Sequence, residues 1–184
     1  MPNYHRNLVE GGTYFFTVVT YQRRHILTHP IARKILHNAW ELTNERHPFQ
    51  TLAICLLPDH IHCIWKLPDG DADYSTRWKE IKRHFSLDYS KQFGPGEERT
   101  NSRQKQKETA IWQRRFWEHT IEDEDDFDAH FDYIHYNPVK HGFVENPIDW
   151  QWSTFHRYVK QGLYDNEWCG GDIGKLDRLE FECC

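Results

Sequence analysis

Stretches with a strand-like pattern of apolar residues alternate with stretches of helical spacing along the first part of the chain. Residues 13–20, 52–57 and 60–65 are rich in β-branched and aromatic residues, which is typical of strands. Apolar residues recur every three or four positions over residues 29–46, which predicts a helix. The Pro58-Asp59 pair suits the centre of a tight turn, so the second and third strands are predicted to form a hairpin.

Similar patterns of apolar residues occur toward the C-terminus. We expect a helix over residues 75–92, a loop over 93–110, a strand over 111–121 and a helix over 122–137. Asn137-Pro138 should end this last helix or begin its exit. The order β-α-β-β-α-β-α predicts an α+β, ferredoxin-like split βαβ fold. Its sheet should be mainly antiparallel with four or five strands, followed by an added C-terminal helix and an irregular tail.

Composition excludes disordered and membrane-spanning proteins. The mean hydropathy is −0.87, yet 15% of residues are aromatic, far more than in disordered chains. No apolar run reaches the roughly 18–20 residues that cross a bilayer, and no signal peptide is visible. The five cysteines form no CxxC pair. We therefore expect a reduced, cytoplasmic protein without membrane contact.

Charge is distributed unevenly along the chain. The net charge is −5, but residues 1–120 hold 18 basic and 13 acidic side chains, whereas residues 121–184 hold 5 and 15. Residues 77–115 are the most basic stretch, with 11 basic and 5 acidic side chains. Such a stretch can bind phosphates or can simply be a solvated surface, and charge alone leaves both open. The acidic end after about residue 165 could also cover the basic part.

His60-Ile61-His62 is the first candidate for chemistry. Because strand side chains alternate, both imidazoles should emerge on one face of the sheet, opposite Ile61, Cys63 and Trp65. Two imidazoles so placed can chelate one divalent ion. With 13 histidines in the chain, however, a purely structural pair is the competing interpretation.

The last predicted helix supplies a second candidate. Its core stripe is Phe127, Phe131 and Ile134, and its neighbouring polar row is Asp126, His130, Tyr133 and Asn137. Tyr133 and Asn137 are therefore one turn apart, so a phenol nucleophile could lie beside a third metal ligand. The alternative is that Tyr133 only packs its ring.

Taken together, these motifs resemble the HUH single-tyrosine transposases of the IS200/IS605 type, and within them the REP-associated tyrosine transposases. The resemblance covers roughly residues 4–168, in order. It rests on residues 11–18 (GGTYFFTV), 57–65 (LPDHIHCIW), 77–82 (RWKEIK), 112–119 (WQRRFWEH), 132–142 (DYIHYNPVKHG) and 150–155 (WQWSTF). Residues 93–110 are longer than expected for this branch, and the last dozen residues match nothing in it.

The resemblance implies a role for each site residue. His60, His62 and Asn137 would be ligands of Mg²⁺ or Mn²⁺, and Tyr133 would be the nucleophile. Tyr136 is the rival, but it lies about 60–100° away from the row that holds Asn137. Residues 1–145 would form the catalytic domain, and residues 146–184 an aromatic-rich, acidic extension packed on or near it.

The resemblance also implies a reaction and a substrate. The reaction would be transesterification on single-stranded DNA through a 5′-phosphotyrosine. The substrate would be a repetitive extragenic palindrome (REP), a DNA hairpin with a single strand at its foot. The candidate DNA contacts are Arg77, Lys79, Lys82, Arg83, Arg114, Arg115, Trp78 and Trp117, with core packing as the alternative for both tryptophans. The bacterial protein would act as a monomer with Tyr133 in cis, although a dimer that exchanges the tyrosine stays open.

Two other classes compete with this enzyme. A hairpin-binding protein would hold REP DNA without cutting it. A nucleotide hydrolase of the histidine-triad type would alternate three histidines on its strand, whereas position 64 is Ile. A covalent link between protein and DNA separates the first hypothesis from both alternatives.

Overall fold

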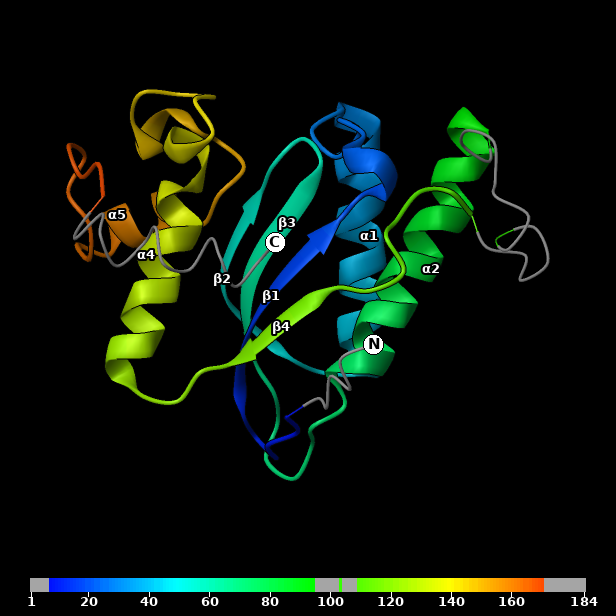
Figure 1. The fold of residues 1–184 in the computed structure, drawn as a ribbon, viewed down its shortest axis with the longest axis horizontal. Coiled ribbons are helices and arrows are strands. Elements are labelled where there is room, and N and C mark those ends of the chain that lie inside the picture. Colours follow the sequence, from blue (N-terminus) through cyan, green and yellow to red (C-terminus); the bar gives the residue numbers. More distant parts are fainter. Residues whose placement is uncertain (1–6, 95–102, 104–108, 171–184) are drawn as a thin grey trace.

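The computed structural model describes residues 7–94, 103 and 109–170, and Figure 1 shows a sheet with helices packed on both of its faces. The strands are β1 (Thr13–Val19), β2 (Gln50–Leu56), β3 (His60–Lys66) and β4 (Trp117–Thr120). The helices are α1 (Pro30–Arg46), α2 (Tyr74–Phe93), α4 (Glu124–Lys140) and α5 (Phe155–Lys160), with short 3-10 turns η1 (Tyr21–Arg23) and η2 (Pro147–Asp149).

The strands form one antiparallel sheet in the order β2-β3-β1-β4. This confirms the predicted α+β class, with four strands in the described part of the chain. The β2–β3 hairpin is closed by a hydrogen bond from the Leu57 N–H to the His60 carbonyl. The predicted boundaries of the first three strands and of α1 and α2 hold to within about two residues.

The predicted strand over 111–121 is only partly correct, because β4 begins at Trp117. Trp112 makes an isolated bridge to Thr20, and the chain then leaves the ladder. The Trp112 ring is buried and packs 5.0 Å from the Phe85 ring of α2. Residues 111–113 are held by this packing and by two backbone hydrogen bonds, from the Tyr21 N–H to the Ile111 carbonyl and from the Gln113 N–H to the Val19 carbonyl. The regular ladder with β1 is formed by Trp117–Thr120.

Alternation along β1 and β3 gives the sheet two different faces. On one face, Phe16, Trp65 and their apolar neighbours pack against α1 and α2, with the Trp65 and Trp78 rings stacked 4.4 Å apart. On the other, Phe15 and Ile64 pack against α4. We call these the aromatic face and the α4 face.

Helix α4 begins at an Asp123 cap, whose carboxylate accepts from the Asp126 N–H, and three acidic residues follow in its first turn. Of the two expectations for Asn137-Pro138, the structure agrees with the start of the helix exit, because α4 runs on to Lys140. A proline in the last turn removes only one helical hydrogen bond. At the end of α4, the His141 N–H donates to the Asn137 carbonyl and the Phe143 N–H donates to the Pro138 carbonyl.

The segment after α4 packs on the outer edge of β2. The Leu56 N–H donates to the Trp152 carbonyl and the Thr154 N–H donates to the Ile54 carbonyl, both at 2.9 Å. Trp150 and Phe155 are buried in the core of the α4 face. Within the described ranges, no helix has the length and apolarity to cross a membrane. The predictions for the tail beyond residue 170, and for most of the loop over 93–110, lie outside the described residues.

Candidate active site

The two histidines of β3 lie side by side on the α4 face, so the prediction that they share a face is confirmed. Their ring centroids are 4.7 Å apart and the rings are nearly perpendicular. Both side chains are buried, and the β1–β3 register places His62 opposite Thr17 and His60 opposite Val19.

A second layer of polar groups orients the two rings. His62 Nδ1 is 2.9 Å from Thr17 Oγ1, and His60 Nδ1 is 2.6 Å from Asp59 Oδ1. Asp59 in turn accepts from Arg23 at 3.2 Å. Burial alone would raise the pKa of Asp59, but the bonds and charges of His60 and Arg23 outweigh burial and lower that pKa to about 2. An ionised Asp59 is a hydrogen-bond acceptor for Nδ1 of His60, and such a contact orients the ring as the outer contacts of metal-binding histidines do.

His62 is held in the neutral form. Burial, followed by the charges of His60, His141 and Lys140, lowers the pKa of the His62 ring well below its usual value. A neutral imidazole is the form that binds a metal ion. Among the described residues, neither His60 nor His62 has a hydrogen bond at Nε2.

Tyr133 joins the pair from α4. Its ring centroid is 5.2 Å from that of His62 and 6.0 Å from that of Phe15, and Lys140 Nζ lies 5.1 Å from the Tyr133 centroid. The rival, Tyr136, is half-buried and packs against Gly170, away from the two histidines. The geometry thus brings together Tyr133 and His62, not Tyr136.

Asn137 is the most informative residue of the site. It is fully buried, and neither Oδ1 nor Nδ2 of its amide has a hydrogen-bond partner among residues 7–94, 103 and 109–170. Leaving such a group unpaired costs about 1–3 kcal/mol, so its presence points to a ligand. Asn137 lies one turn after Tyr133, which contacts His62, and one turn before His141, whose ring is 5.2 Å from that of His60. Asn137 therefore belongs to the same row of α4 as the two residues whose rings contact the histidine pair.

Two imidazole nitrogens and an amide oxygen fit a divalent cation such as Mn²⁺ or Mg²⁺, with its remaining positions left for water and substrate. Sequence reasoning assigned no role to Lys140, His141, Thr17 and Asp59. Spacing along one helical face from Tyr133 would have indicated the first two, and the alternation of β1 would have indicated Thr17.

Two of the predicted DNA contacts are wrong. Arg77 is buried, and its guanidinium bonds to Asp71 at 2.7 Å and to the Pro48 carbonyl at 2.6 Å, so it is not available to a phosphate. Trp78 is fully buried between Trp65 and Phe16 and cannot stack on a base. Its alternative, core packing, is correct.

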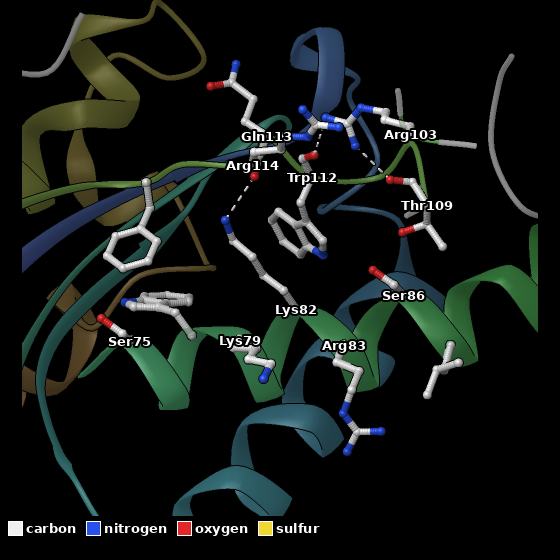
Figure 2. A pocket seen from close by; sticks show the side chains of 13 residues that line it. Ser75, Lys79, Lys82, Arg83, Ser86, Arg103, Thr109, Trp112, Gln113 and Arg114 are labelled. Carbon is white, nitrogen blue, oxygen red and sulfur yellow. Dashed lines mark hydrogen bonds between the residues drawn. The ribbon is translucent and has the colours of Figure 1, made fainter. Parts of the chain in front are cut away.

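The other predicted cations, apart from Arg115, line one groove on the aromatic-face side of the molecule (Figure 2). The groove has a volume of about 660 Å³ and lies between α2 and residues 109–116. Lys79, Lys82 and Arg83 come from α2, and Arg114 comes from the facing segment. Arg103, which sequence reasoning missed, also lines it and donates to the carbonyls of Thr109 and Trp112.

An antiparallel sheet that presents a histidine pair to a tyrosine-bearing helix defines the class of HUH single-tyrosine enzymes. Residues 9–137 match the family described as Transposase IS200 like. The chain therefore belongs to this family of DNA-cleaving transposases, and the resemblance drawn from its motifs is confirmed.

Relatives match nearly the whole chain. A protein of Haemophilus influenzae is 46% identical over 177 residues, which are 96% of this chain and 98% of the relative. The REP-associated tyrosine transposase of Escherichia coli K12 is 42% identical over 92% of each chain. A solved structure of a REP-associated tyrosine transposase bound to a REP hairpin superposes with a TM-score of 0.78, at 41% identity over 94% of this chain and 93% of the other.

Proposed function

We propose that this chain cleaves and rejoins single-stranded DNA at the foot of a REP-type hairpin, with Tyr133 as the nucleophile. The observation that carries this proposal is the buried amide of Asn137, which has no hydrogen-bond partner among the described residues and lies one helical turn after Tyr133, whose ring packs on that of His62. The hairpin is inferred from the relatives, one of which is bound to a REP hairpin. The contact between Tyr133 and His62 of the same chain supports a tyrosine that acts in cis. A monomer that works in the cytoplasm belongs to the same proposal.

The reaction is an exchange of esters. The Tyr133 oxygen attacks the scissile phosphorus, the bond from phosphorus to the 3′-oxygen breaks, and the phenolic proton ends on that oxygen. The products are a 5′-phosphotyrosine and a free 3′-OH. Since one phosphodiester replaces another, the 3′-OH of a second strand can reverse the step and join two DNA ends.

His60, His62 and Asn137 would hold Mg²⁺ or Mn²⁺. When bound, such an ion polarises the scissile phosphate and offsets the charge that develops on it. Thr17 and Asp59 keep the two imidazoles in place for this task. Lys140, near the Tyr133 ring, favours the negative charge that develops on the attacking phenol.

The groove between α2 and residues 109–116 would bind the phosphates of the hairpin stem. Lys79, Lys82, Arg83 and Arg114 supply its positive charge. The groove and Tyr133 lie on opposite sides of the sheet, and β4 is the edge strand that the DNA would have to pass. Arg115 is exposed just before β4, and Trp117 belongs to it, so both would contact DNA along that path.

The first experiment asks for the covalent intermediate. With a REP hairpin oligonucleotide and Mn²⁺, the wild-type chain should form a protein–DNA adduct that survives denaturation. Tyr133→Phe should form none while it binds the hairpin as before, and the matched variant Tyr136→Phe should form the adduct. An adduct with Tyr133→Phe would refute the assignment. Tight binding by the wild type without any adduct, in Mg²⁺ or in Mn²⁺, would favour the hairpin-binding alternative.

The second experiment tests the groove. Replacing Lys79, Lys82 and Arg83 together by Gln should weaken hairpin binding and reduce the slope of log affinity against log salt by about 0.9 for each stem phosphate contact that is lost. The control replaces Lys34, Arg46 and Lys160, which lie outside the groove, by Gln. Equal losses in both variants would mean that the effect is one of net charge and not of this groove.

A further inference from the structure

A second group of metal-binding side chains lies next to the Tyr133 site and takes no part in it. His119 belongs to β4, whereas Asp126 and His130 lie one turn apart on α4. One ligand atom from each of the three lies within 4.8 Å of the other two. The Phe15 ring separates the two sites, with its centroid 4.8 Å from that of His130 and 6.0 Å from that of Tyr133.

The fold brings these residues together for simple reasons. The β1–β4 register places His119 opposite Phe15, so its ring points toward α4. There it stacks on His130, with centroids 4.5 Å apart and an angle of 16° between the planes. The Asp126 carboxylate lies 2.9 Å from His119 Nε2 and 2.9 Å from His130 Nδ1. It also accepts from the Glu122 N–H, which fixes its orientation.

We propose that His119, Asp126 and His130 form a binding site for a divalent transition ion, for which Zn²⁺ has the best chemical fit. Two imidazole nitrogens and one carboxylate oxygen are the ligand set of zinc sites that keep an open position. The His119 and Asp126 side chains are 26% and 21% exposed, so an ion can enter from solvent, whereas His130 closes the inner side. The Glu122 N–H holds the carboxylate in place, as outer contacts do at metal sites.

A competing explanation is a brace without metal. In it, the Asp126 carboxylate merely links the two imidazoles and so ties β4 to α4. Both explanations predict that a large truncation at this place lowers stability. The two differ in whether an ion binds, and in what happens when His119 is replaced by a side chain that can still donate a hydrogen bond.

The experiment uses the full-length chain with ZnCl₂ as the probe. To remove binding at the first site, the measurement is made in His60→Ala, and repeated in the wild type. By equilibrium dialysis and calorimetric titration, His60→Ala should bind one Zn²⁺ per chain. Adding His119→Gln, which keeps a donor toward Asp126, should weaken this binding at least tenfold. Adding His37→Ala, an exposed histidine of α1, should leave it unchanged.

A second readout reports on the ligands directly. Co²⁺ bound to two imidazoles and a carboxylate gives visible absorption bands, which His60→Ala should show and His60→Ala/His119→Gln should lose. The proposal is overturned if His60→Ala binds no Zn²⁺, or if His119→Gln leaves Zn²⁺ affinity and the Co²⁺ spectrum unchanged. Absence of this Zn²⁺ site would not contradict the proposed cleavage reaction, because the adduct at Tyr133 is measured separately.

Discussion

The two faces of the sheet are built from the same strands, but they bury different kinds of side chain. On the aromatic face, Phe16, Trp65 and Trp78 are fully buried; the two tryptophan rings stack, and Phe16 packs at an angle to both. On the α4 face, the buried groups include His60, His62 and Asn137, and the amide of Asn137 lacks a partner in the described part of the chain. Both faces contain a buried apolar core, but the α4 face also buries ionisable and amide side chains that can bind a ligand, at a cost in stability.

The largest effect should come from the α4 face and should concern activity. His62→Ala removes a proposed metal ligand, and metal assistance is worth several kcal/mol. Adduct formation with a REP hairpin should therefore fall by about 1000-fold or more. Cys63→Ala is the matched control, because Cys63 is the next residue and is buried on the aromatic face. It should cleave normally when folded, and equal loss in both variants would contradict the division between the faces.

The next effect should come from the aromatic face and should concern stability. Trp78→Ala removes a fully buried ring from the stack with Trp65 and Phe16. Urea unfolding should show a loss of about 3–5 kcal/mol. Adduct formation per folded molecule should stay within about twofold of the wild type. A selective loss of hairpin binding at unchanged stability would revive the discarded prediction that Trp78 stacks on a base.

A smaller effect on stability should come from the ion pair between Arg77 and Asp71. Arg77→Met breaks its ion pair with Asp71 and leaves that carboxylate without its partner. Because Asp71 is about one third exposed, we expect a loss of about 2 kcal/mol rather than the 3–5 of a fully buried pair. The hydrogen bond from Arg77 lowers the pKa of Asp71, so the pair stabilises the fold above about pH 4 and loses this contribution as the pH falls through the lowered pKa.

Unfolding of Arg77→Met and the wild type at pH 7 and at pH 3 measures this directly, and the difference between them should shrink at the lower pH. Hairpin affinity should be unchanged, in contrast to the groove variant. A drop in affinity with a reduced salt slope would return Arg77 to the DNA contacts.

The smallest effect should come from Thr17, whose hydroxyl orients the proposed metal ligand His62. Thr17→Val keeps the shape of the side chain and removes the oxygen that holds His62 Nδ1. Loss of such an outer contact costs about 10–100-fold in metal affinity. Cleavage should therefore require about tenfold more Mn²⁺, with little loss at saturation. Thr13→Val, on the same face of β1 but outside the site, should show the wild-type dependence.

Much of this fold could be predicted from patterns within single elements. The alternation of β3 placed His60 and His62 on one face, and the helical spacing of α4 placed Tyr133 beside Asn137. Both inferences need only the period of one element. The order of the motifs along the chain was enough to identify the family. The DNA contacts were harder, because Arg77 and Lys79 look alike in the sequence. Only the tertiary position of Asp71 and the Pro48 carbonyl decides that one is buried and the other lines the groove.

The course of the chain after residue 110 could not be read for a similar reason. Ile111 and Trp112 have strand-like residue types, and they bond to the chain at the end of β1, but the packing of their side chains in the core with α2 limits this pairing to an isolated bridge. Helical spacing places Asp126 beside His130, but His119 comes from a strand, so the period of one element could not reveal the group of three. Its distances depend on the register of β4.

The attachment of residues 150–155 to β2 gives the sheet one closed border. The Trp152 carbonyl and the Thr154 N–H occupy backbone groups of Leu56 and Ile54 that would otherwise be open. An open row of this kind recruits strands from other chains and leads to aggregation. Cutting the protein at residue 145 would bare that border and also remove Trp150 and Phe155 from the core. Residues 150–155 thus cover the edge strand, and we expect a shortened enzyme to associate with its own copies through the exposed backbone of β2.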